Sequence, residues 1–441
     1  MSGLTGKFGA SLARIEDSLR EFDGVVRFGR VSAVTGPMIR ASVPEARIGG
    51  IVRIRRSLLP PLVAEVIGFD RQDALLMPLG QMEGIEARAV VEPSIGERLV
   101  PVGDSVRGRV LDALGTPIDG LGPLGPERAP AVLPPPNPLK RNRIREVLPT
   151  GVRTIDGLLT LGKGQRVGIF AAAGGGKTTL LASIARNVQA DRVVLALIGE
   201  RGREVRGFLE DDLGEEGLKK ATIVVSTSDQ PALLRLKAAY TATAIAEHAR
   251  AAGENVVLMM DSVTRFARAL RDVGLAAGEP PGRQGYPASV YAELPRLFER
   301  AGNDATGSIT GIYTVLVSGD DIQEPVADET MSLLDGHFIL SRKLAARSHY
   351  PAIDVTRSKS RVRNEIISHE HRALADSVLG VVGEYEENFD KITLGMYEHS
   401  SESDRPDPAA TYPIIERFLR QDLEEASPFD QTLESLSKLL P

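Results

Sequence analysis

A chain of 441 residues with 42% apolar side chains is too long for a single core and has ample apolar material for two or three. Its formal net charge of −6 argues against a nucleic-acid groove as the main binding surface, because such grooves need a clustered excess of Lys and Arg. The absence of cysteine excludes disulfide bonds and thiolate metal sites. No apolar run reaches the roughly 18 residues that cross a bilayer, and the N-terminus lacks the apolar core of a secretory signal, so we expect a cytoplasmic protein.

The first predicted element is a short helix within residues 9–22. Its apolar side chains recur at spacings of three and four and form one stripe, namely Leu12, Ile15, Leu19 and Phe22. The stripe could pack on the helix's own domain or bind a partner protein, and the sequence leaves both readings open. We treat residues 1–24 as a separate N-terminal segment.

The next stretch is rich in β-branched residues and predicts a small β-barrel. Short apolar runs alternate there with Gly and Pro at regular spacing, which is typical of such barrels. The runs cover residues 31–34, 39–43, 48–54, 62–69 and 75–79. We bound this domain at residues 25–95. Proline is dense between residues 120 and 151, which excludes one helix or a central strand and predicts a surface connection.

From Gly151 to about Ser360, strand-like apolar runs alternate with helical segments. The runs cover residues 166–170, 193–198, 221–225, 256–260 and 309–317. This alternation predicts a mostly parallel α/β sheet with helices on both faces, within a domain that we bound at residues 96–361. Residues 362–441 then form a C-terminal helical domain, with helices expected over residues 364–385, 412–425 and 430–439.

Residues 171–178 read Ala-Ala-Ala-Gly-Gly-Gly-Lys-Thr and lie between an apolar strand and a helix, which predicts a phosphate-binding loop for ATP. Glycines let backbone N–H groups surround the phosphates, Lys177 supplies a positive charge, and the Thr178 hydroxyl binds Mg²⁺. The first position of the usual G-x-x-x-x-G-K-[ST] pattern holds Ala171, which needs an ordinary φ angle there. The residues expected to contact nucleotide are Ala173, Gly174, Gly175, Gly176, Lys177, Thr178 and Thr179.

Two further acidic residues follow buried strands and complete a hydrolytic site. Asp261 ends the apolar run 256–260, as in a Walker B segment, and is expected to hold the water shell of Mg²⁺. Glu200 follows the run 193–198 through Gly199 and is predicted to be the general base for the attacking water. We also expect Glu204 to assist the metal through water. His369 and His371 are two apart, so they do not share a helical face, and we predict no metal site there.

The segment 351–354, Pro-Ala-Ile-Asp, with Ser-Lys-Ser-Arg at 358–361, resembles the signature of the rotary ATP synthase α/β family. Further segments resemble the protein-export branch of that family: Gly-Glu-Arg-Gly-Arg-Glu at 199–204, Asp-Ser-Val-Thr-Arg at 261–265, Glu-Pro-Pro at 279–281, Gly-Tyr-Pro-Ala-Ser-Val at 285–290 and Glu-Arg-Ala-Gly-Asn at 299–303. Segments 170–178, 234–243 and 259–265 look more like type III secretion (injectisome) ATPases than flagellar export ATPases, which more usually carry Gly-Ser-Gly-Val-Gly-Lys-Ser.

The resemblance implies an α/β fold, a RecA-like P-loop ATPase core with an N-terminal β-barrel and a C-terminal helical domain. It implies that Tyr350 stacks on adenine, that Arg361 is an arginine finger for a neighbour's γ-phosphate, and that Arg201 and Arg265 line the phosphate pocket. One chain then carries both the base Glu200 and the finger, so a homohexamer is sufficient. Residues 272–285 would form a loop facing the central channel of that ring.

The resemblance also implies partners and a place in the cell. These are a stator protein bound through the N-terminal helix, a central stalk protein, chaperone–effector complexes and the export gate, at the cytoplasmic face of the inner membrane. The work would be to release chaperones and unfold export substrates; nucleic acid is not expected as a partner. The alternatives are a flagellar export ATPase, a hexameric RNA-translocating ATPase with steeply salt-dependent RNA binding, and a ring scaffold that binds nucleotide without turnover.

Overall fold

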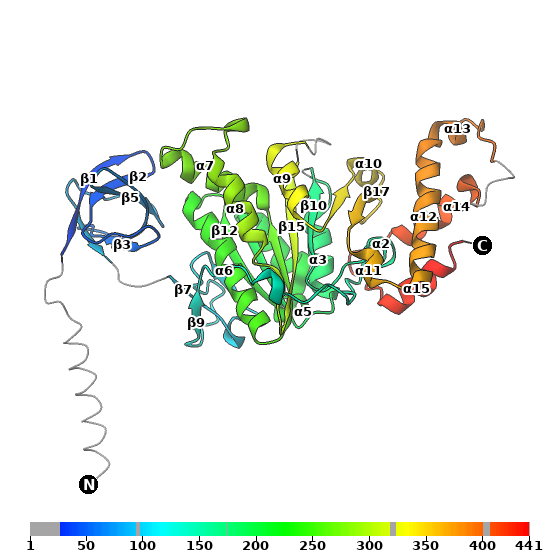
Figure 1. Cartoon of the computed structure of the whole chain (residues 1–441), viewed down its shortest axis with the longest axis horizontal. Helices are drawn as coiled ribbons and strands as arrows, with labels where there is room; N and C mark the ends of the chain where they lie inside the picture. The colour runs from blue at the N-terminus through cyan, green and yellow to red at the C-terminus, as the bar shows by residue number, and fades with distance from the viewer. Residues whose placement is uncertain (1–26, 94–97, 173, 318–322, 400–405, 441) are drawn as a thin grey trace, which may run out of the picture. The chain divides into compact units, whose positions relative to one another are not determined.

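The structure is a computed structural model that describes residues 27–93, 98–172, 174–317, 323–399 and 406–440 (Figure 1). The chain divides into two compact units, Met1–Glu97 and Arg98–Pro441. The helix predicted within residues 9–22 and the loop residue Ala173 lie outside the described residues. No helix in the described ranges is long and apolar enough to cross a membrane.

The described part of the first unit is a closed antiparallel barrel, as the sequence predicts. Its strands run in the order β1-β2-β5-β4-β3-β6. They are β1 (Gly29–Thr35), β2 (Met38–Ser42), β3 (Ile51–Ile54), β4 (Leu62–Asp70), β5 (Asp73–Pro78) and β6 (Val90–Pro93). Alternate side chains such as Val31, Ile39 and Leu76 fill the interior. None of the apolar runs found in the sequence covers β6, which closes the barrel by pairing with both β1 and β3.

The second unit is built on a mainly parallel sheet. Within the described residues it has nine strands, in the order β17-β16-β10-β15-β13-β11-β12-β8, with β14 paired to β15. They are β8 (Val110–Asp112), β10 (Arg166–Ala171), β11 (Arg192–Glu200), β12 (Ala221–Thr227), β13 (Asn255–Asp261), β14 (Gly302–Asn303), β15 (Ser308–Leu316), β16 (Gly336–Leu340) and β17 (Ile353–Ser360). Of the strands in the described part of this sheet, only β14 and β17 run antiparallel to their neighbours. A separate two-stranded ribbon pairs β7 (Leu99–Pro101) with β9 (Arg128–Pro130).

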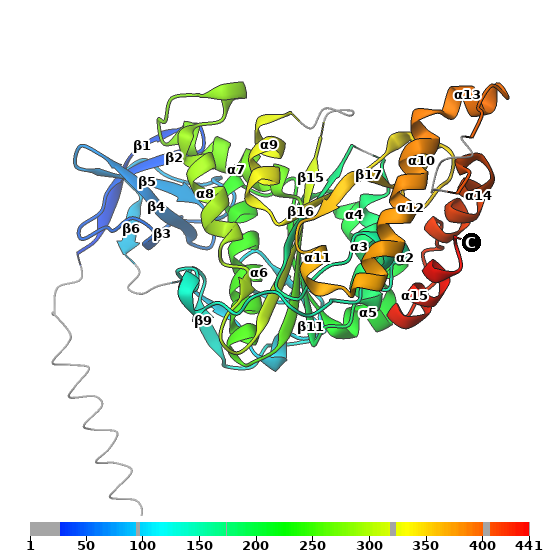
Figure 2. The same ribbon diagram turned by 45° about the vertical axis from the view of Figure 1, so that its right-hand side comes forward.

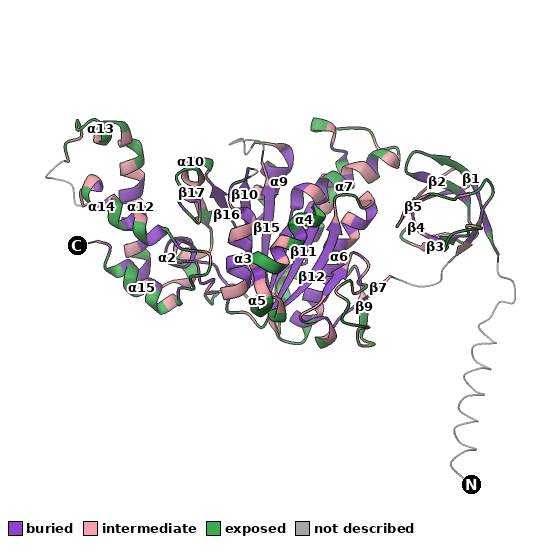
Figure 3. Cartoon of the chain, turned by 180° about the vertical axis from the view of Figure 1, so that it is seen from behind, coloured by how far each residue is buried: buried purple, intermediate pink, exposed green. Residues whose placement is uncertain are grey.

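Helices cover both faces of this sheet. The chain moves from β10 to β11 to β12 in one direction and then returns to β13 and β15, so right-handed crossovers place the two sets of helices on opposite faces. Figure 2 shows α6 (Ala232–Ala251), α7 (Val263–Ala276) and α8 (Ala288–Phe298) on one side and α3 (Lys177–Asn187) and α5 (Gly214–Lys220) on the other. The strands between them are almost wholly buried, as the purple ribbon of Figure 3 shows.

Short helices complete the core of the second unit. They are α2 (Arg153–Leu158), α4 (Gly202–Gly207), the π-helix η3 (Phe208–Leu213), α9 (Pro325–Leu333), α10 (Arg342–Ala346) and α11 (Arg363–Ile366), with 3₁₀ turns η1 (Asp104–Val106), η2 (Pro138–Lys140) and η4 (Arg283–Gly285).

The C-terminal residues are helical, as predicted, but the helix bounds differ from the prediction. The helices are α12 (His369–Glu387), α13 (Phe389–Thr393), α14 (Pro408–Leu419) and α15 (Phe429–Ser437). Helix α14 begins earlier than expected because Asp407 caps it, accepting a hydrogen bond from the Ala409 N–H, and Pro408 suits its first turn. Helices α12, α14 and α15 pack on α2 and share one apolar cluster with the sheet.

Candidate nucleotide-binding site

The loop between β10 and α3 has the backbone shape of a phosphate cradle. Gly174 and Gly176 have φ angles of +79° and +80°, which side chains disfavour. An added Cβ at Gly176 would lie 3.2 Å from a ring carbon of Tyr350, so space there is also limited. Gly176 precedes α3 and has no side chain to cap it, which leaves the first N–H groups of the helix available to an anion.

Ala171 explains why the loop needs no glycine at its first position. It is the last residue of β10 and pairs with Leu316 on β15 and Leu340 on β16. It is therefore an extended, fully buried strand residue, a conformation that alanine adopts without strain.

Lys177, the first residue of α3, lies at the centre of a buried charge cluster. Its Nζ donates to Oδ1 of Asp261 and lies 3.9 Å from Oε1 of Glu200. The Thr314 hydroxyl donates to the same Asp261 oxygen at 2.8 Å. The two carboxylates meet because β11 and β13 are adjacent parallel strands whose carboxyl ends lie at one edge of the sheet. All three residues are buried, each with less than a tenth of its surface exposed: Lys177, Glu200 and Asp261.

Glu200 has the environment of a base that titrates near neutral pH. Burial, reinforced by the negative charge of Asp261 and a hydrogen bond with Glu204, raises the pKa of Glu200 from 4.5 to about 7. The same hydrogen bond lowers the pKa of Glu204. Arg265 limits the rise, since its Nη1 lies 2.9 Å from Oε2 of Glu200 and also donates to the Gly199 carbonyl.

Three predicted site residues lie further from this cluster or make other contacts. Arg201 is exposed and pairs with Glu204 at 3.3 Å. Glu204 therefore contacts Glu200 and Arg201, and among the described residues it makes no hydrogen bond or ion pair with Asp261 or Lys177. Thr178 is half-buried on the first turn of α3.

The described residues form no cluster of three or more His, Cys, Asp or Glu that could hold a metal by itself. The donors present fit a Mg²⁺ ion instead, which is usually held by one or two carboxylates together with substrate phosphates and water. Asp261 supplies a carboxylate beside the cradle, and Thr178 supplies a hydroxyl one residue after Lys177.

A pocket of about 180 Å³ opens beside the phosphate loop. Its lining comes from α2, α3, the segment before β17 and the segment after α14: Val152, Gly176, Thr179, Leu180, Ser183, Tyr350, Pro351, Gln421, Asp422 and Leu423. The Tyr350 ring lies against Gly176, and 42% of the residue is exposed, so part of it is accessible to a flat partner. No motif in the sequence points to residues 421–423, which reach the pocket from the segment between α14 and α15.

Gln421 fixes this far wall of the pocket. Its backbone N–H donates to the Tyr350 carbonyl at 2.8 Å, and its side-chain amide donates to the carbonyls of Gly151 at 2.7 Å and Glu425 at 2.8 Å. Its side-chain oxygen accepts from the Arg153 N–H at 2.8 Å. The side chain of Gln421 thus anchors its own segment, and its backbone N–H holds the Tyr350 carbonyl.

Arg361 lies at the amino ends of the parallel strands, whereas the phosphate loop lies at their carboxyl ends. It follows Ser360, which pairs with Gly336 near the start of β16, whereas the loop follows the far end of β10. The six residues of β10 at about 3.3 Å each separate those ends by roughly 20 Å. Arg361 is exposed, and this separation places it far from a nucleotide bound by its own chain's loop.

Three family models match the chain. They are the nucleotide-binding domain of the ATP synthase alpha/beta family over residues 151–360, the beta-barrel domain of that family over residues 31–94, and the T3SS EscN ATPase C-terminal domain over residues 367–438.

Two curated relatives are similar over nearly the whole chain. The flagellum-specific ATP synthase of Bacillus subtilis (strain 168) is 47% identical over 427 residues, covering 96% of this chain and 97% of the relative. The type 3 secretion system ATPase of Sinorhizobium fredii (strain NBRC 101917 / NGR234) is 44% identical over 431 residues, covering 97% and 96%.

A solved structure of the assembled ATPase EscN from the enteropathogenic E. coli type III secretion system matches with a TM-score of 0.87 and 43% identity, over 94% of this chain and 100% of that one. EscN in complex with its central stalk EscO matches with the same values. These matches confirm the predicted fold class.

Proposed function

The chain belongs to the ATP synthase alpha/beta family, among its type 3 secretion system and flagellum-specific ATPases, and we propose that it is the ATP-hydrolysing motor of a bacterial type III protein secretion apparatus. The observation that supports hydrolysis best is the buried cluster of Lys177, Asp261 and Glu200 at the edge of the sheet, beside a glycine cradle. A scaffold that only binds nucleotide has no need of a buried carboxylate whose pKa is raised to about 7.

The chain's own residues can perform in-line hydrolysis. Glu200 accepts a proton from a water molecule whose oxygen bonds to the γ-phosphorus, while the bond to the bridging oxygen of the β-phosphate breaks to give ADP and phosphate. The Lys177 ammonium neutralises charge on the transferred group, and Arg265 holds Glu200 in place. Mg²⁺, bound by Thr178 and by Asp261 through water, would supply further charge neutralisation on the phosphate oxygens. The Tyr350 ring would stack on adenine in the adjoining pocket.

Arg361 completes a site on a second copy of the chain. Its place at the edge remote from its own phosphate loop supports action across a subunit interface, as an arginine finger. Because each chain carries both Glu200 and Arg361, a homohexameric ring contains a complete site at every interface.

Steady-state phosphate release from the purified chain with Mg-ATP tests the proposed chemistry. We expect Lys177→Ala and Glu200→Gln to abolish turnover, while Lys219→Ala, which removes an exposed lysine on α5, keeps it. We expect Arg361→Ala to retain nucleotide binding but lose the turnover that rises with protein concentration. Full activity in Lys177→Ala or Glu200→Gln would show that the site lies elsewhere.

The secretion system served is the second part of the proposal. We place the protein at the cytoplasmic face of the inner membrane, releasing chaperones from substrates and unfolding them for the export gate, with a stalk in the ring and a stator on residues 9–22. The C-terminal family model supports an injectisome, whereas the 47% identity to a flagellum-specific relative keeps flagellar export as the second candidate. Affinity purification from the native cell decides between them, since the two systems have different co-purifying components.

A further inference from the structure

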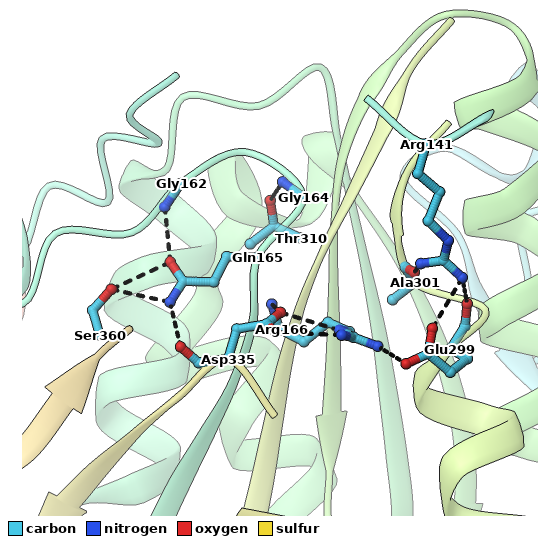
Figure 4. A network of polar contacts seen from close by, with 10 residues as sticks. All are labelled: Arg141, Gly162, Gly164, Gln165, Arg166, Glu299, Ala301, Thr310, Asp335 and Ser360. Atoms are coloured by element: carbon cyan, nitrogen blue, oxygen red, sulfur yellow. Dashed lines mark hydrogen bonds and ion pairs between the residues drawn. The ribbon is translucent and has the colours of Figure 1, made fainter. Parts of the chain in front are cut away.

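The end of β10 remote from the phosphate loop carries a dense polar cluster around Asp335 (Figure 4). Gln165 is fully buried, and its amide nitrogen donates to the Asp335 carbonyl at 3.1 Å and to the Ser360 hydroxyl at 3.0 Å. Its amide oxygen accepts from the Gly162 N–H at 2.9 Å. With donors and acceptor all engaged, the Gln165 side chain is locked in one orientation.

Arg166 binds the side chain of Asp335, whose backbone carbonyl Gln165 binds. Its backbone N–H and its Nε donate to the Asp335 carboxylate at 3.0 Å and 3.1 Å. Its guanidinium also binds Glu299 at the end of α8, and Glu299 in turn binds Arg141. Figure 4 shows the Arg166 side chain extended between Asp335 and Glu299. The backbone and the carboxylate of Asp335 are thus both fixed to Gln165 and Arg166, where β10 begins.

Asp335 is also the support of Arg361. The Arg361 N–H donates to the Asp335 carbonyl at 2.9 Å, the same oxygen that Gln165 binds. Arg361 directly follows Ser360, whose hydroxyl Gln165 holds and which itself donates to the Thr160 carbonyl at 2.9 Å. The backbone on which the exposed Arg361 side chain stands is therefore anchored twice, at its own N–H and one residue before.

We propose that Gln165 and Arg166 are positioning residues that set the place of Arg361 for the nucleotide of the adjoining subunit. This inference rests on the proposed action of Arg361 between subunits. One strand then serves two active sites, with the phosphate loop of its own site at the carboxyl end of β10 and the support of a neighbour's arginine at the amino end. Rigid support matters because an arginine finger acts through geometry, and among the described residues the Arg361 side chain makes one hydrogen bond, to the Met331 carbonyl at 3.5 Å.

Rings assembled from two different variants of the chain distinguish this positioning role from a merely structural one. In Gln165→Met the side chain keeps its bulk but loses the two donated bonds, and we expect kcat to fall roughly 10- to 100-fold with KM for ATP little changed, since a misplacement of about 1 Å can cost about 10²-fold. The exposed Gln189→Met is the matched control and should keep full activity.

The variant is then co-assembled with Lys177→Ala, which lacks a working phosphate loop but has an intact Arg361. In a 1:1 mixture about a quarter of the interfaces join the intact loop of one variant to the intact finger of the other. We expect the mixture to be several-fold more active than the sum of the two variants alone. Asp335→Asn, a milder change at the same support, should complement Lys177→Ala in the same way.

Two reference mixtures keep the outcomes distinct. Glu200→Gln with Lys177→Ala must stay inactive, because both changes damage the same side of the interface. Arg361→Ala with Lys177→Ala tests the proposed function itself. If that pair recovers activity and the Gln165→Met and Asp335→Asn mixtures do not, the positioning role is wrong and the arginine finger stands. If the Arg361→Ala pair also fails to recover, the action of Arg361 between subunits is wrong and the inference falls with it.

Discussion

Replacement of Glu200 by Gln should stabilise the folded chain at alkaline pH while it removes activity. Burial and the charge of Asp261 raise the pKa of Glu200 from 4.5 to about 7. Below pH 4.5 the carboxyl is protonated in both folded and unfolded chains and its titration has no effect on stability. Above pH 7 it is charged in both, and the folded state is then about 3 kcal/mol less stable than with a neutral group, at about 1.4 kcal/mol per pH unit. Gln resembles the neutral form at every pH.

Urea unfolding followed by circular dichroism checks this at pH 4.5 and pH 8. We expect Glu200→Gln and the wild type to unfold alike at the lower pH, and the variant to be about 3 kcal/mol more stable at the higher pH. Glu210→Gln is the control: it removes an exposed carboxylate paired with Arg206 and should change stability by less than about 1 kcal/mol at both. A Glu200→Gln variant that is less stable than wild type at pH 8, or whose gain does not vary with pH, would refute the reasoning.

Further predictions concern the catalytic pH range and the nucleotide pocket. The kcat/KM of the wild type should fall as pH drops through about 7, because protonated Glu200 cannot accept a proton, and a flat profile from pH 6 to 8 would exclude it as the base. Tyr350→Ala should raise KM for ATP several-fold with kcat less affected, whereas Tyr350→Phe keeps the ring and stays near wild type; equal KM values would mean that adenine binds elsewhere. Gly176→Ala forces a side chain into φ +80° against Tyr350, so titration with a fluorescent ATP analogue should show weakened binding, and unchanged binding would contradict the cradle. Gln421→Leu removes the partners of the Arg153 N–H and the Glu425 carbonyl, while the Gly151 carbonyl still accepts from the Ser427 N–H, and it should cost about 1–3 kcal/mol in urea unfolding for each group that stays unpaired; an unchanged midpoint would show that other groups replace it.

The parts of the site that sequence reasoning could locate are those in which the signal is local. The glycine loop, the start of α3 and the acidic ends of β11 and β13 each follow an apolar run, and parallel strands bring such ends to one edge of a sheet. That rule is enough to predict that Glu200 and Asp261 lie near Lys177, as the structure shows. The hydrogen bond between Glu200 and Glu204 was not predicted, because it depends on how α4 turns after Arg201.

The parts that could not be predicted depend on contacts between distant segments. Strand β17 buries only some of its residues and its sequence is mostly polar, so a search for apolar runs does not find it. Its antiparallel direction, which places Arg361 at the amino ends of the parallel strands, is therefore not predicted either. Helix α14 was expected to continue to residue 425, but it ends at Leu419 and the chain turns to an extended course at Arg420. That turn brings Gln421 within hydrogen-bond distance of the carbonyls of Gly151 and Tyr350. The periodicity of the sequence does not predict these contacts.

The position of Gln421 concerns the boundary between the nucleotide-binding domain and the C-terminal helical domain. The family models give residues 151–360 and residues 367–438 to different domains, yet the nucleotide pocket takes one wall from each. The apolar cluster beneath it likewise contains strand residues such as Val355 together with Ala375 of α12 and Phe418 of α14. Because the proposed adenine pocket and this cluster both cross the boundary, the C-terminal helices help to build that pocket, and a fragment that ends at residue 361 would lack Gln421 and the wall that it supports.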